Sequence, residues 1–67
     1  MRVKLMSPDK MMTVVLIETN DGLEVRSRRD FGAGGVEHSN TRKVKDSIDE
    51  LVERYEKRLW KVVEIED

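Results

Sequence analysis

The 67-residue chain has no cysteine, one histidine, one proline and only three aromatic residues. Without cysteine no disulfide can form, and the commonest zinc ligands are missing. A disulfide framework is therefore excluded and a zinc centre is disfavoured. We expect no cofactor and no metal ion. The lack of disulfides fits an intracellular protein, and we expect a cytoplasmic location.

Long apolar runs are also absent, since the longest is 14–17, VVLI. No segment is long enough to be a signal peptide or to cross a membrane, so we expect no membrane partner. The length allows one domain at most and excludes kinases, α/β-hydrolases and two-domain Rossmann enzymes. The missing glutamine and the 40% share of charged residues resemble thermophilic composition.

Valine is abundant, with nine residues against a single alanine, which favours β structure. Alternation at 2–6 and 23–29, and the apolar, β-branched segment 11–19, predict three strands. The turn sequences 7–10, SPDK, and 20–22, NDG, separate these strands, and Gly22 can supply a positive φ. The sequence therefore predicts a three-stranded antiparallel meander.

The second of these strands is apolar on both faces. One face carries Met12, Val14 and Leu16, which suit a core. The other face carries Met11, Val15 and Ile17, which we interpret as an interaction surface for a second copy or another protein, unless Phe31 and Val36 cover it.

The glycine-rich segment 30–40, DFGAGGVEHSN, is predicted to be a flexible connection. An apolar stripe of helical period then runs from Val44 to Leu59, so we expect a helix from about Thr41. A capping box at Ser47 and Glu50 favours the later start instead. Residues 60–65, WKVVEI, can extend the helix, but their β-branched content favours a strand. The predicted fold is one α+β domain over residues 1–67, ordered β-β-β-α-β, with the helix across one sheet face.

Three short motifs suggest catalysis but lack the context that catalysis needs. The kinase-like tripeptide 30–32, DFG, stands in a chain too short for a kinase. The segment 32–37, GAGGVE, has glutamate where a dinucleotide fingerprint ends in glycine. His38 lies beside Glu37 and Ser39, but loop neighbours rarely converge as a catalytic pair. We expect no catalytic residues and a non-enzymatic binding module.

Charge is unevenly distributed, because residues 1–45 carry nine basic and six acidic residues, whereas 46–67 carry four and eight. Two basic clusters flank the glycine-rich segment and suit phosphate groups. They comprise Arg26, Arg28, Arg29, Arg42, Lys43 and Lys45. We therefore expect a nucleic-acid-binding module that uses these six residues. The alternative is a protein-interaction module that self-associates, as a homodimer for example, through Met11, Val15 and Ile17.

Overall fold

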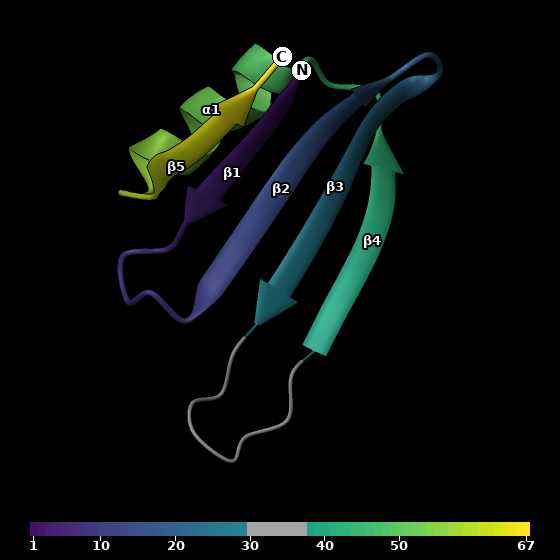
Figure 1. The fold of residues 1–67 in the computed structure, drawn as a ribbon. Helices are drawn as coiled ribbons and strands as arrows, with labels where there is room; N and C mark the ends of the chain where they lie inside the picture. The colour runs from purple at the N-terminus through teal and green to yellow at the C-terminus, as the bar shows by residue number, and fades with distance from the viewer. Residues whose placement is uncertain (30–37) are drawn as a thin grey trace.

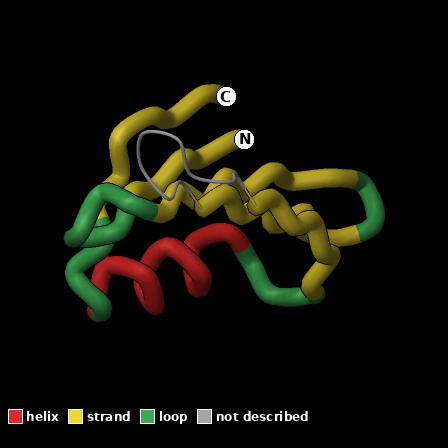
Figure 2. Tube along the Cα trace, turned by 90° about the horizontal axis from the view of Figure 1, so that it is seen from below, coloured by secondary structure: helices red, strands yellow, loops and turns green. Residues whose placement is uncertain are grey.

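In the part of the chain that the structure describes, five antiparallel strands form one sheet, and one helix lies against one of its faces (Figures 1 and 2). The computed structural model describes residues 1–29 and 38–67. Its elements are β1 (Arg2–Met6), β2 (Met12–Thr19), β3 (Gly22–Arg29), β4 (His38–Val44), α1 (Ile48–Lys57) and β5 (Lys61–Glu66). The strands are arranged in the order β4-β3-β2-β1-β5.

The core lies between the sheet and α1. Strands β1, β2 and β3 each alternate, so that every second side chain turns toward the helix. These buried side chains meet Ile48 and Leu51 of α1. The strand residues in this core are Val3, Leu5, Val14, Leu16, Leu23 and Val25.

The hairpin between β2 and β3 has the geometry that its sequence predicts. Asn20 and Asp21 form the loop, and Thr19 pairs with Gly22. Gly22 has a φ of 141°, which favours glycine, and a Cβ there would stand 3.0 Å from the carbonyl oxygen of Val44. Glycine therefore allows β4 to end close against the hairpin.

Helix α1 begins after Ser47, whose side chain accepts a hydrogen bond from the Glu50 amide. The prediction of a helix from Thr41 was wrong, and the capping box marks the true start. Residues 41–44 instead belong to β4, where Val44 pairs with Leu23. Val44 packs against the core from β4 and stands four residues before Ile48, so its position also fits the helical stripe. This coincidence moved the predicted start of the helix too early.

The predicted connection 30–40 is too long, because residues 38–40 belong to β4 and pair with β3. Residues 30–37, which contain the glycines of that segment, lie outside the described residues. The predicted C-terminal strand is confirmed as β5, which pairs with β1. The sheet therefore has five strands, β4 being the strand that the predicted order omitted.

A β-bulge interrupts the pairing of β1 with β5 between Lys4 and Leu5. Beyond the bulge in the direction of β5, Glu64 lies opposite Lys4, and Glu66 lies opposite Arg2. In the described part of the chain, no helix has the length and apolar character needed to cross a membrane.

Candidate functional site

The sheet face opposite α1, here called the open face, is not covered by any helix of the described residues (Figure 2). Alternation along the strands brings to it the side chains that do not enter the core. The cations that line the centre of this face are Arg2 and Lys4 from β1, and Arg26 and Arg28 from β3. It therefore combines positive charge from strands that are far apart in the sequence.

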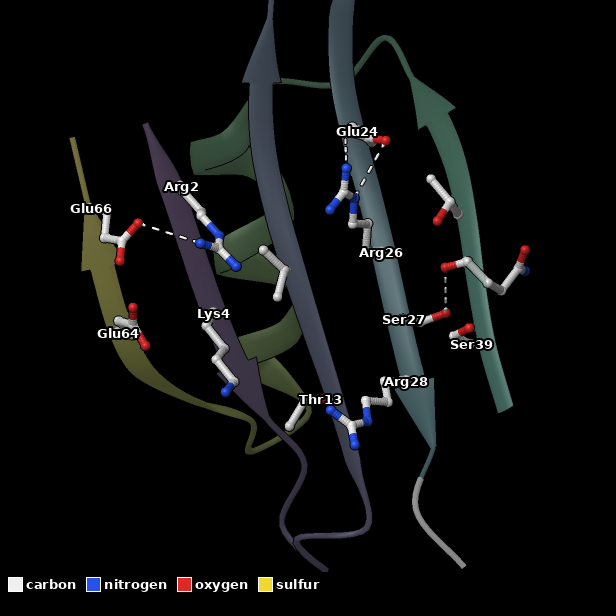
Figure 3. Close-up of a pocket in the computed structure, with 13 residues that line it drawn as sticks. Arg2, Lys4, Thr13, Glu24, Arg26, Ser27, Arg28, Ser39, Glu64 and Glu66 are labelled. Atoms are coloured by element: carbon white, nitrogen blue, oxygen red, sulfur yellow. Dashed lines mark hydrogen bonds and ion pairs between the residues drawn. The ribbon is translucent and has the colours of Figure 1, made fainter. Parts of the chain in front are cut away.

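A groove of about 440 Å³ runs over the open face. Thr13 and Val15 of β2 line it. Val15 lies between Lys4 and Arg26 in the register of the strands, and Figure 3 shows Thr13 between Lys4 and Arg28. Ser39 and Thr41, which pair with Arg28 and Arg26, add hydroxyl groups on the side of β4. The groove thus offers hydrogen-bond donors around a partly apolar floor.

Two of the arginines in the groove form ion pairs with neighbouring carboxylates. An Nη1 atom of Arg2 lies 3.4 Å from Glu66, and the Nε atom of Arg26 lies 3.4 Å from Glu24. Both arginine side chains are about half exposed, and ion pairs in such positions contribute little stability. The guanidinium groups can therefore exchange these partners for an anionic ligand at small cost.

Three carboxylates of the described residues line the groove. Figure 3 shows Glu24 and Glu66 toward one end, Glu64 beside Lys4, and Thr13 and Arg28 toward the other end. At the latter end the open face continues into a smaller hollow of about 180 Å³, to which Lys10 adds a further cation. Three cations, Lys4, Lys10 and Arg28, line this smaller hollow, and no carboxylate of the described residues does.

The structure brings together only part of the basic set that the sequence suggested. Arg26 and Arg28 lie on the open face, as their alternation with Leu23 and Val25 predicted. Arg29 is the last residue of β3, where alternation places it on the side facing away from Arg28.

The remaining three residues of that set diverge. Lys43 lies on the open face beside the β2–β3 hairpin, and its ammonium group contacts Asp21 at 3.0 Å. This contact lowers the pKa of the Asp21 carboxyl group. Arg42 is on the helix side of β4, opposite Val25, and Lys45 follows the strand.

Sequence reasoning missed Arg2 and Lys4, which supply the β1 side of the groove. The sequence does indicate that Arg2 and Lys4 share the face opposite the core, because they alternate with the core residues Val3 and Leu5. Arg2 and Lys4 stand far from the other basic residues in the sequence, so clusters of basic residues along the chain do not include them. Antiparallel pairing makes neighbours of residues that are distant in the chain.

The predicted interaction surface is divided by charged residues. Val15 lies between Lys4 and Arg26 in the register of the strands, and Ile17 lies between Arg2 and Glu24. Both are half-buried, whereas Met11 precedes β2 and lines the smaller hollow. Self-association through these residues stays a prediction, and Phe31 and Val36 lie outside the described residues.

Comparison with protein-family models, curated proteins and solved structures gives no match. Within residues 1–29 and 38–67, no cluster of three or more His, Asp or Glu side chains could hold a metal ion. The function is therefore inferred from the groove itself.

Proposed function

We propose that the protein binds nucleic acid through its phosphate backbone in the open-face groove. The observation that carries the proposal is the arrangement of Arg2 and Lys4 on one side of β2 and Arg26 and Arg28 on the other. Arginine and lysine side chains are the principal phosphate contacts of proteins. Thr13 and Ser39 supply hydroxyl groups that can donate to phosphate or sugar oxygens.

The dimensions of the sheet favour a single strand over a duplex. Two inter-strand spacings separate β1 from β3, so their side chains rise from backbones about 10 Å apart. One sugar-phosphate chain can lie along β2 between them, whereas a duplex would contact only the rims. The preferred ligand is therefore single-stranded DNA or RNA.

Recognition in this groove depends on charge and not on base identity. No aromatic side chain of residues 1–29 and 38–67 lines it, so these residues offer no ring on which a base could stack. Binding releases counterions from the phosphates, and the affinity falls steeply as salt rises. We expect little sequence preference from this face.

The test is a fluorescence anisotropy titration with short single-stranded and duplex oligonucleotides, from about 50 mM to about 200 mM salt. The double variant Lys4→Gln, Arg28→Gln should bind more weakly. Its slope of log affinity against log salt should be shallower by about 1.4, because two phosphate contacts are lost at roughly 0.7 each.

The matched control is the double variant Arg54→Gln, Lys57→Gln. It removes the same charge from α1, where both side chains are exposed and pair with carboxylates. Its salt slope should equal that of the unchanged protein. The proposal fails if the unchanged protein binds no oligonucleotide at low salt, or if the two double variants weaken binding equally. Stronger binding to duplex than to single strand would contradict the preferred ligand.

A further inference from the structure

A second hollow lies on the helix side of the sheet, between the end of α1 and the strands β3 and β4. Its volume is about 380 Å³, within the range of small-molecule sites. The side chains of Met12, Val14 and Val25 give it an apolar floor. It is separated from the open-face groove by the sheet.

Two of the three aromatic residues of the chain line this hollow. The rings of Tyr55 and Trp60 contact each other with their centroids 4.8 Å apart, tilted by 56°. Both side chains are partly exposed although they pack against the core. Part of each ring surface is therefore open to a ligand, while contacts with the core fix the position of the ring.

Two arginines also line the hollow, and no carboxylate of the described residues does. Arg42 comes from β4, and Arg58 is the C-cap residue of α1. Neither forms an ion pair with another residue in the described part of the chain. Asn40 adds an amide group beside them. An anion that enters this hollow meets two positive charges, and no acidic side chain of the described lining competes for them.

We propose that this hollow binds a nucleotide, with the base against Tyr55 or Trp60 and the phosphate between Arg42 and Arg58. Aromatic rings stack on nucleobases, and guanidinium groups bind phosphate in a bidentate manner. The ligand is a phosphorylated nucleoside, either free or as one unit of a single strand. The inference does not rest on the proposed function, because it concerns the opposite face.

The test uses the fluorescence of Trp60, which is the only tryptophan. Adenosine monophosphate, adenosine and inorganic phosphate are titrated separately into the full chain. The monophosphate should change the emission in a saturable manner, and adenosine or phosphate alone should bind at least about tenfold more weakly, since each lacks one half of the contacts. A short oligoadenylate distinguishes the sources, because tighter binding than the monophosphate indicates a strand.

The variants Arg42→Gln and Arg58→Gln should each weaken binding of the monophosphate by about tenfold. The control Arg54→Gln removes an arginine of α1 that pairs with Asp46 and does not line the hollow. It should leave the response unchanged, and circular dichroism shows whether each variant is folded.

The proposal is overturned if Trp60 shows no saturable response, or if adenosine and its monophosphate bind equally. It is also overturned if both arginine variants bind like the control. The Lys4→Gln, Arg28→Gln double variant should keep the monophosphate response. The experiments therefore distinguish a failure of the nucleotide proposal for this hollow from a failure of the nucleic-acid proposal for the open-face groove.

Discussion

At the scale of single residues, the turn between β1 and β2 is organised by Ser7 and Asp9. Ser7 is buried, and its hydroxyl accepts a hydrogen bond from the Met12 amide and donates one to Asp9. Asp9 also accepts a hydrogen bond from the Met11 amide at 3.0 Å. The hydrogen bond from Ser7, followed by that from Met11, lowers the pKa of Asp9.

The lowered pKa of Asp9 predicts an acid-dependent contribution to stability. A carboxyl group with a lower pKa in the folded state stabilises the protein above its unfolded pKa, near 3.8, and loses this effect as the pH falls through the folded value. The variant Asp9→Asn should therefore be less stable than the unchanged protein at neutral pH, and the difference should shrink in strong acid. Urea unfolding at neutral and acidic pH measures it.

A matched comparison is Asp49→Asn, at an exposed carboxylate in the first turn of α1. If the two variants lose the same stability at neutral pH and the same part of it in acid, the hydrogen bonds from Ser7 and Met11 do not cause the effect.

At the scale of elements, α1 depends on its N-cap. Ser47 accepts from the Glu50 amide at 3.2 Å, which satisfies one of the free amides of the first turn. Ser47→Ala should lower the free energy of unfolding by about 1 kcal/mol. Urea unfolding followed by circular dichroism measures this loss.

The control for the cap is Ser39→Ala, since Ser39 is an exposed serine of β4. We expect that change to alter stability by less than about 0.5 kcal/mol. Equal losses in the two variants would show that Ser47 does not stabilise α1 through its cap.

Most elements could be predicted from the sequence because their signals are local. The alternation of β1 to β3, the Asn20-Asp21-Gly22 turn and the β-branched residues of β5 each identify a strand or a turn. β4 could not be identified in this way, since its only apolar residue is Val44 and its other side chains are polar. What makes it a strand is pairing with β3 along its whole length, which is a tertiary effect.

The candidate site was predictable only in part for the same reason. Alternation placed Arg26 and Arg28 on an exposed face, but joining them to Arg2 and Lys4 requires the strand order. The register puts Lys4 and Arg26 on either side of Val15. Proximity in the chain suggested Arg42 and Lys43 as one cluster, whereas adjacent residues of a strand point to opposite faces.

At the scale of the whole molecule, the strands differ in how many partners hold them. β2 and β3 each pair on both sides, whereas β5 pairs only with β1 and has its outer edge exposed within the described residues. Val63 and Ile65 of β5 are 50% and 59% exposed. We therefore expect β5 to be less firmly held than the centre of the sheet.

Amide hydrogen exchange tests this expectation. The amides of β5 should exchange through local opening, at a lower free energy than those of β2, which require global unfolding. Urea should have a smaller effect on exchange in β5, because local opening exposes less surface. Equal protection and equal urea dependence in both strands would show that β5 is part of one cooperative unit.

The pairing of β5 with β1 also sets an order of events during folding. Every other strand pair joins neighbours in the sequence, whereas this pair brings Glu66 beside Arg2. Closing so large a loop costs more chain entropy than forming a hairpin, so the hairpins have a kinetic advantage. Until β5 docks, β1 is itself an unprotected edge strand, open to pairing with another chain. The rate at which β5 docks therefore determines how long a newly made molecule is exposed to misassembly.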